Sequence, residues 1–154
     1  LGDITNDCRC SMPQIQRYRS RVSGPLLDRI DIHVEAPAVR VDDLQDNRLG
    51  ESSYDIRNRI QKCRAIQAKR YQENKLLSNA NITNKMLVKY CKIGTKEAAI
   101  LKRAMNELSL SARAYDKILK VSRTIADLAD SENIEMNHLL EAIQYRSLDR
   151  SLIL

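Results

Sequence analysis

Apolar residues recur at helical spacing through the C-terminal two thirds of the chain. The clearest stripe follows Ser111, and its apolar and small positions are Tyr115, Ile118, Leu119, Ser122, Ile125, Ala126 and Ala129. Steps of three and four residues place these side chains on one face of a helix. Similar stripes begin after Ser52 and Thr95, and shorter patterns begin near Asn84 and Met136. The pattern therefore predicts a bundle of helices from residue 52 onwards.

Some side chains of these helices are expected to face the interior of the bundle. In the first helix they are Ile56, Ile60, Cys63, Gln67 and Tyr71. In the helix after Thr95 they are Ala98, Leu101, Met105 and Leu108, and in the last helix Leu139, Leu140 and Ile143. Ser52 or Ser53, Thr95 and Ser111 are expected N-caps, because a hydroxyl oxygen accepts a bond from a first-turn N–H group. Asp55, three residues after Ser52, is close to a capping-box arrangement.

The N-terminal third has a different pattern. Pro13 suits the first turn of a helix, which we expect to continue to about Val22 before Ser23-Gly24-Pro25 ends it. From Ile32 to Ala36 apolar and polar residues alternate, which predicts a strand with one buried face. A lone strand leaves its edges unpaired, so the rest of its sheet is expected outside this sequence. The chain thus divides into a helix-turn-strand segment (1–37), a polar connector (38–51) and a helical domain (52–154).

Composition and charge fit a mainly α-helical protein. The 154 residues include neither Phe nor Trp, so any core is aliphatic, which suits helices better than a β-sandwich. Lys and Arg number 26 against 20 Asp and Glu, for a net charge of +6. This excess favours an anionic partner such as a nucleotide or nucleic acid, although ordinary solubility explains it equally well.

Three features of the sequence bear on where the protein is found and on whether the chain is a fragment. No apolar run approaches the roughly 20 residues that span a bilayer, and no signal peptide is evident. We therefore expect a cytoplasmic protein without a membrane partner. The chain starts at Leu1 in a loop-like stretch, which indicates a fragment of a longer protein.

The four cysteines are of two kinds. Cys63 and Cys91 lie among apolar positions and are expected to be small buried hydrophobic residues. Cys8 and Cys10 stand close together between polar neighbours, and two thiolates supply half of a tetrahedral Zn²⁺ site of about four ligands. The other ligands are not evident in the sequence. No secreted disulfide pattern is present, so a reducing compartment is expected.

Arg113 falls in the first turn of the helix that Ser111 begins. Backbone N–H groups there lack intrahelical partners and the helix dipole is positive, so a cation is disfavoured by about 0.3–1 kcal/mol at an exposed site. A bound anion reverses that sign, because the guanidinium and the N–H groups share it. The alternative is a surface arginine paired with Asp116. The spacing alone leaves both possibilities open.

Other basic residues also have two interpretations. Arg29 follows Asp28 and precedes Asp31, and on local evidence an ion pair is the simpler explanation. The basic residues of the first long helix either follow a phosphate backbone or form a solvated face, and the candidates for nucleic-acid contact are Arg59, Lys62, Lys69 and Arg70. The chain has no glycine-rich G-x-x-x-x-G-K-[ST] loop, so we expect no complete ATPase in this piece.

Two long stretches, CRCSMPQIQRYRSRVSGPLLDRIDIHVEAP (8–37) and LSLSARAYDKILKVSRTIADLADSENIEMNHLLEAIQYRSLDR (108–150), carry a family resemblance. They resemble the C-terminal part of the magnesium-chelatase-like AAA+ ATPases, and within them the bacterial ComM/YifB group associated with DNA handling in natural transformation. The resemblance covers essentially the whole chain. It implies the helical lid of an AAA+ ATPase, preceded by the last helix-turn-strand of the α/β ATPase core.

The resemblance also implies roles for single residues. Arg29, in the LLDRID turn, looks like the arginine finger that reaches the γ-phosphate bound by a neighbouring subunit. Arg113, in LSARAYDK, looks like the sensor 2 arginine of the lid, and Lys117 stands where many relatives carry arginine. The family has a Cys-Pro-Cys-Gly element upstream, so Cys8 and Cys10 resemble the second half of a four-cysteine Zn²⁺ site.

For the longer protein the resemblance implies a homo-oligomeric ring, a hexamer, that uses ATP and Mg²⁺. This piece lacks the Walker A and Walker B segments and is expected to be inactive alone. Three functions remain open: coupling of ATP hydrolysis to DNA remodelling, as in a branch-migration helicase; nucleic-acid binding by a stand-alone basic helical module; and ATP-driven metal insertion into a porphyrin. The upstream cysteine element of the family favours the first.

Overall fold

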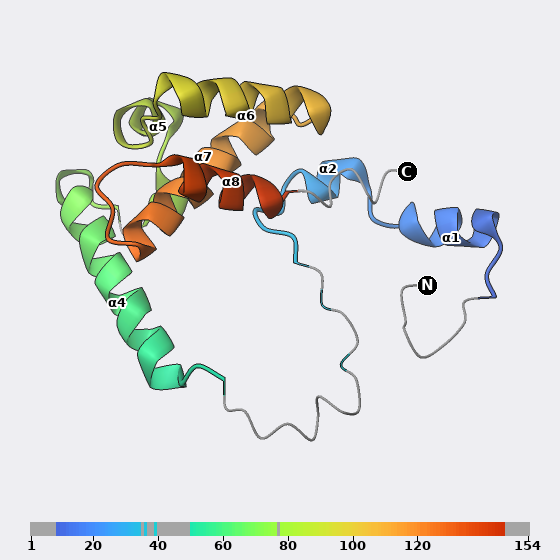
Figure 1. Cartoon of the computed structure of the whole chain (residues 1–154), viewed down its shortest axis with the longest axis horizontal. Coiled ribbons are helices and arrows are strands. Elements are labelled where there is room, and N and C mark those ends of the chain that lie inside the picture. The colour runs from blue at the N-terminus through green and yellow to red at the C-terminus, as the bar shows by residue number, and fades with distance from the viewer. Residues whose placement is uncertain (1–8, 35, 37–38, 40–49, 77, 147–154) are drawn as a thin grey trace.

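The computed structural model describes residues 9–34, 36, 39, 50–76 and 78–146. The N-terminal helices are α1 (Met12–Arg19) and α2 (Gly24–Leu27). The bundle helices are α4 (Ser53–Arg70), α5 (Asn84–Tyr90), α6 (Thr95–Glu107), α7 (Ala112–Leu128) and α8 (Met136–Gln144), with the short 3₁₀ helices η1 (Gln72–Asn74) and η2 (Asn79–Asn81) between α4 and α5 (Figure 1). The predicted mainly α-helical fold is confirmed.

α7 is the central helix of the bundle. It packs against α4, α5, η2 and α8, and α6 packs on α8. One cluster of buried side chains joins these elements, and its members are Tyr71, Ile82, Leu87, Cys91, Leu101, Ile118, Leu119, Ala126, Ile134, Leu139 and Ala142. Apart from Tyr71 the cluster is aliphatic or thiol, as the lack of Phe and Trp requires.

Two of the three expected N-caps are confirmed. The Ser52 hydroxyl accepts from the N–H of Asp55 (3.1 Å) and donates to its carboxylate (2.6 Å). The Ser111 hydroxyl accepts from the N–H of Ala114 (3.2 Å). The prediction for Thr95 is wrong by one residue, because Gly94 is the N-cap of α6 and Thr95 its first residue.

The expected strand at 32–36 does not form in the described residues of this segment. A strand requires a neighbouring strand, and here the N–H of His33 donates instead to the carbonyl of Tyr145 at the end of α8 (2.9 Å). Ile32 and Val34, the apolar positions of the alternation, are 45 % and 73 % exposed. The segment is therefore an extended connection tied to α8.

Several side chains expected inside the bundle are exposed. Cys63, Gln67 and Tyr71 of α4 are buried, but Ile56 and Ile60 are not, because the first half of α4 extends past the other helices (Figure 1). The other exposed positions of the predicted stripes are Ala98, Tyr115, Ala129 and Leu140. The stripes thus mark the correct helices but overstate how much of each is covered.

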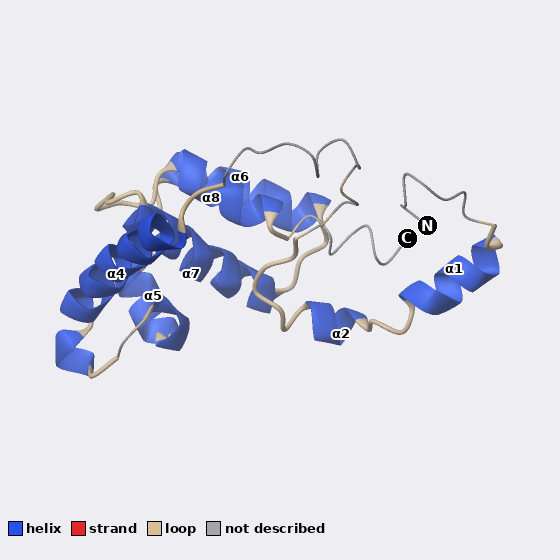
Figure 2. Ribbon diagram, turned by 90° about the horizontal axis from the view of Figure 1, so that it is seen from below, coloured by secondary structure: helices blue, strands red, loops and turns tan. Residues whose placement is uncertain are grey.

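α1 stands apart from the bundle. It has no buried residue and ends at Arg19, earlier than the expected Val22. Seen from below in Figure 2, α2 lies between α1 and the bundle. Only Leu27 of α2 is buried, so the contact of this region with the bundle depends on the polar residues that follow it.

Candidate functional site

The turn after α2 packs against the N-terminus of α7. Asp28 Oδ1 accepts a hydrogen bond from the Ser111 hydroxyl (2.5 Å), and Oδ2 lies 3.8 Å from Nη1 of Arg113. A carboxylate at this place is favourable, because the N-terminus of a helix carries partial positive charge. The sequence analysis missed this role of Asp28, since Ser111 is 83 residues away and no local pattern links them.

Lys117, one turn further along α7, makes the second contact with this turn. Its ammonium donates to the carbonyl of Arg29 (2.5 Å) and forms an ion pair with Asp31. Just after the end of α8, Arg146 donates to the carbonyl of Ile30. Residues 28–31 are thus held to the bundle one after another.

Arg29 and Arg113 come from these two contacting elements. The Arg29 guanidinium donates to the carbonyl of Pro25 (2.7 Å), and Arg29 is exposed. Among the described residues, the carboxylates expected beside Arg29 serve other partners: Asp28 serves the α7 N-terminus and Asp31 serves Lys117. Arg113 pairs with Asp28 and not with the expected Asp116. The structure therefore brings the two arginine-bearing elements together through Asp28.

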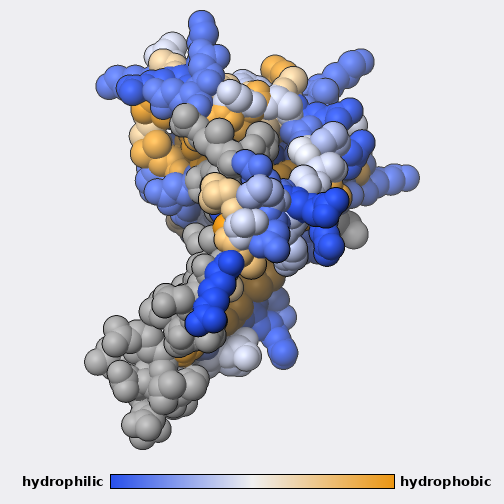
Figure 3. Space-filling view, turned by 90° about the vertical axis from the view of Figure 1, so that its right-hand side faces the viewer, coloured by the Kyte–Doolittle hydropathy of each residue, from blue (hydrophilic) through white to orange (hydrophobic). Residues whose placement is uncertain are grey.

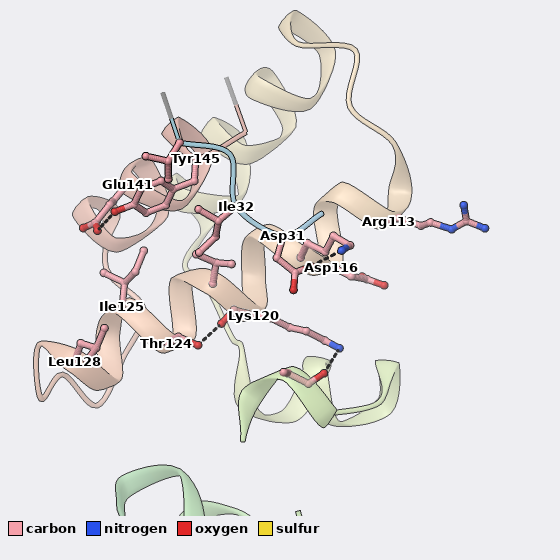
Figure 4. Close-up of a pocket in the computed structure, with 14 residues that line it drawn as sticks. Asp31, Ile32, Arg113, Asp116, Lys120, Thr124, Ile125, Leu128, Glu141 and Tyr145 are labelled. Carbon is pink, nitrogen blue, oxygen red and sulfur yellow. Dashed lines mark hydrogen bonds and ion pairs between the residues drawn. The ribbon is translucent and has the colours of Figure 1, made fainter. Parts of the chain in front are cut away.

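A groove of about 690 Å³ runs along the outer side of α7 (Figure 4). Its apolar lining includes Ile32, Val34, Val121, Ile125 and Leu128, and Arg113, Asp116, Lys117 and Lys120 also line it. In Figure 4 the Arg113 side chain points away from the groove into solvent, while Glu141 of α8 and Tyr145, just after α8, lie at the far end. Such a groove suits a ligand with an apolar part and a negatively charged part.

Arg70, a candidate for nucleic-acid contact, is part of a buried polar network. Its guanidinium binds both oxygens of Asp127 (2.5 and 2.7 Å), and this hydrogen bonding raises the pKa of Arg70. The fully buried Asp127 carboxylate also accepts from Arg123 (3.0 Å) and Asn79 (2.9 Å). The network joins α4, η2 and α7, so Arg70 has a structural role. The i,i+4 spacing of Arg123 and Asp127 was the one signal of it in the sequence.

The remaining candidates on α4 differ in their surroundings. Arg59 forms a two-bond ion pair with Glu51 (2.5 and 2.9 Å) at the exposed start of the helix. Lys62 and Lys69 are exposed. The four α4 cations therefore do not form one uniform surface.

The cysteines of the two kinds are found in different places. Cys63 and Cys91 are buried as predicted, and burial raises the pKa of Cys91 to about 11. Cys8 lies outside the described residues and Cys10 is exposed. The described ranges contain no group of three or more His, Cys, Asp or Glu side chains placed to hold a metal ion. In the same ranges no helix has the length and apolar character needed to cross a bilayer.

The sequence of the chain matches one class of protein. The helical part, residues 50–146, matches the family described as magnesium chelatase, subunit ChlI C-terminal, and residues 1–44 match magnesium chelatase, subunit ChlI. The chain belongs to this magnesium chelatase family.

Among its relatives, the chain is 44 % identical to competence protein ComM of Haemophilus influenzae over 94 % of its length. It is 40 % identical to YifB of Escherichia coli over 96 % of its length, and 29 % identical to a Mycobacterium bovis protein over 91 %. The match covers 28 % of the ComM protein and 29 % of YifB, so the chain spans less than a third of the curated relatives it matches.

Proposed function

We propose that this chain is the lid region of an ATP-dependent AAA+ motor, together with the last part of its ATPase core. In the longer protein, with ATP and Mg²⁺ bound upstream, Arg29 and Arg113 stabilise phosphate charge during hydrolysis. The observation that supports this is the shared carboxylate of Asp28, which connects the Arg29 turn to the α7 N-terminus.

Arg113 is suited to exchange one anion for another. Its side chain is 69 % exposed and lies 3.8 Å from Asp28, a separation typical of a weak surface pair. The same place, beside Arg113, also has hydrogen-bond donors, because Ser111 and the first turn of α7 form a helix N-terminus. A phosphate group carries at least the charge of the carboxylate it would replace, so Arg113 acts as the nucleotide sensor of the lid.

Arg29 acts on a different nucleotide, the one bound by the neighbouring subunit of a homo-oligomeric ring. Its guanidinium lies on the exposed face of the turn, held only by the carbonyl of Pro25 among the described contacts. The backbone carbonyls of Arg29 and Ile30 accept from Lys117 and Arg146, so the arginine is presented from a fixed stretch of backbone. An arginine supplied in trans raises phosphoryl-transfer rates by about 10³–10⁵.

The substrate that we propose for the motor is DNA, with remodelling of DNA as the work coupled to hydrolysis. The support is the relationship to a protein named for competence. Metal insertion into a porphyrin is the alternative, favoured by the family description of both matches. Stimulation of ATP hydrolysis by DNA in the longer protein separates the two.

The test of the arginine roles uses the longer protein that carries this sequence. Arg29→Ala and Arg113→Ala are each expected to lower ATP turnover by at least about 100-fold, in keeping with the contribution of such arginines. Arg103→Ala is the matched control, because Arg103 is an exposed arginine paired with Glu107 on the outer face of α6. Turnover near that of the control in both variants would contradict the proposal.

A further inference from the structure

α5 and the start of α6 carry a run of lysines with no acidic residue between them in the sequence. From Asn74 to Lys96 the chain contains no Asp or Glu. Four exposed lysines of this run lie on α5, in the turn after it and in the first turn of α6; we call them the lysine surface, and they are Lys85, Lys89, Lys92 and Lys96. This part of the bundle lies at the end remote from α1 and α2 (Figure 1).

The packing of α5 directs two of these lysines outward together. Leu87 and Cys91 face the core, and Lys85 and Lys89 are spaced i,i+4, so they share one face of the helix. Tyr90 fixes the end of α5, because its ring packs edge-on against Tyr71 at 5.1 Å between centroids. The Lys89 ammonium lies 4.9 Å from the centre of the Tyr90 ring. The base of the surface is therefore anchored in the core.

Few carboxylates lie near this surface, and Glu73, which attracts the Lys89 ammonium electrostatically, is one of them. Glu97, the next acidic residue in sequence, folds back over Gly94 at the N-terminus of α6, so close that a Cβ on Gly94 would clash with its carboxylate. Elsewhere, cations of the described chain are held in ion pairs: Arg59 with Glu51, Arg103 with Glu107 and Lys117 with Asp31. Among the described residues none of the four surface lysines takes part in a salt bridge.

We propose that the lysine surface binds the phosphate backbone of nucleic acid. Several exposed cations that outnumber the nearby acids release counterions when they meet phosphates, and such contacts position a nucleic acid without reading its sequence. Figure 3 views the molecule from the right-hand side of Figure 1 and shows hydrophilic side chains at the top, while α5 lies on the side turned away from this view. The identification of the partner as DNA rests on the proposed function, but the surface itself does not.

An anionic membrane fits the surface less well. Binding in the plane of a membrane requires an extended apolar face beside the cations. α5 has seven residues, and Val88, 74 % exposed, is its one apolar side chain with large exposure. A polyphosphate backbone, which needs only point charges, is the better match.

The test compares two variants of equal charge. The surface variant carries Lys→Gln at positions 85, 89, 92 and 96. The control carries Gln in place of four exposed cations of α4, which are Arg57, Lys62, Arg64 and Lys69. Each loses four positive charges, so the net charge falls from +6 to +2 in both. The measurement is fluorescence anisotropy of a labelled 20-nucleotide strand and a 20-base-pair duplex between about 50 and 200 mM salt, the range over which phosphate contacts weaken steeply.

The surface variant is expected to bind at least about 10-fold more weakly, and its duplex affinity is expected to depend less on salt, with a slope smaller by about 3–4. The control is expected to change less than about 3-fold. Equal loss in both variants, no binding by the parent chain at the lowest salt, or tighter binding of polyglutamate than of DNA would overturn the proposal. In the longer protein the surface variant is expected to keep its DNA-independent ATP turnover, whereas Arg113→Ala loses it, so the two proposals fail separately.

Discussion

The carboxylate of Asp28 lies 3.8 Å from the guanidinium of Arg113, although 85 residues separate them in sequence. The same carboxylate accepts from the hydroxyl of Ser111. A negative charge thus already sits at the N-terminus of α7 and links it to the Arg29 turn. Any phosphate that reaches Arg113 competes with Asp28, so phosphate binding there would favour release of the turn.

Replacing Asp28 is expected to loosen the turn without unfolding the bundle. Asp28→Ala removes the contacts to Ser111 and Arg113 but leaves Ser111 as the N-cap of α7. The backbone N–H groups of Arg29 and Ile30 are expected to exchange with solvent at least about 5-fold faster, which corresponds to about 1 kcal/mol of local stability. Hydrogen exchange followed by NMR measures this.

Asp116→Ala is the control for that experiment, because Asp116 is on the same turn of α7 and lines the groove. It is expected to leave exchange of both amides unchanged. Equal protection in the Asp28 variant and the control would show that Asp28 does not hold the turn.

Asp127 is expected to be the most sensitive carboxylate of the bundle. Asp127→Asn keeps the shape of the side chain but leaves the positive charges of Arg70 and Arg123 without their counter-charge in a buried site. Losing one partner of a buried ion pair costs about 3–5 kcal/mol. Urea unfolding followed by circular dichroism is expected to show this loss as a lower midpoint.

The matched control removes the charge of an exposed pair. Glu107→Gln breaks the ion pair of Glu107 with Arg103, whose side chains are 57 % and 79 % exposed. Its effect is expected to stay within about 0.5 kcal/mol. Similar midpoints for the two variants would contradict a structural role for the Asp127 network.

The burial of Cys91 is expected to make the chain less stable at high pH. Its pKa is raised from 9.0 to about 11, so between these values the unfolded chain has lost the thiol proton while the folded chain keeps it. Stability is full below about pH 9 and falls as the pH rises towards 11, by up to about 2–3 kcal/mol at about 1.4 kcal/mol per pH unit. Urea midpoints at pH 8 and 10.5 measure the change.

Cys91→Ala is the control for this pH dependence. It removes the titrating thiol, and the remaining loss at high pH is then due to other groups such as Tyr71, whose pKa burial also raises. The difference between parent and variant should therefore shrink as the pH rises. A constant difference from pH 8 to 10.5 would show that the folded state does not suppress ionisation of Cys91.

Two helix ends are expected to gain stability from glycine. Ser109 after α6 and Asp130 after α7 have φ values of 50° and 54°, in the left-handed region. In each case the next N–H returns to the helix, from Leu110 to Met105 (2.9 Å) and from Ser131 to Ala126 (2.8 Å). Glycine is favoured at this position of such a Schellman motif. Ser109→Gly and Asp130→Gly are each expected to add about 0.5–1 kcal/mol, measured as a higher melting temperature.

Asn106→Gly, on the exposed side of α6, is the opposite control. Within a helix glycine is expected to destabilise by about 0.5–1 kcal/mol. Glycine lowering the melting temperature at all three positions would show that the two left-handed residues are not strained.

The helices and two of their starts were predictable because their causes are local. Ser52 and Ser111 bond to N–H groups three residues away, and the stripe of α7 has the period of the helix itself. The exposure of Ile60 was not predictable, because periodicity identifies a face of α4 but not how far its neighbours extend along it. The prediction of a strand was wrong for a related reason, since the alternation at Ile32 and Val34 does not specify a neighbouring strand.

The polar contacts of the candidate site could not be predicted from spacing. Asp28 meets Ser111 and Arg70 meets Asp127 across 83 and 57 residues. These pairs depend on how α7 packs against other elements, which local patterns do not encode. The sequence did indicate that Arg113 at the start of α7 is a candidate for anion binding, because a cation at a helix N-terminus is unfavourable without an anion nearby.

α7 is one continuous helix that connects the Arg113 end of the bundle to the Asp127 end. It runs without a break from Ala112 to Leu128, and 14 residues separate Arg113 from Asp127. At about 1.5 Å per residue the distance along the axis is about 21 Å. A pivot of about 10° at the Arg113 end therefore carries the Asp127 end through about 4 Å by the same geometry. Because the Arg70–Asp127 ion pair ties α4 to that far end and α5 packs on the same helix, a small tilt of α7 at Arg113, as the proposed phosphate binding would cause, becomes a larger displacement of the opposite side of the bundle.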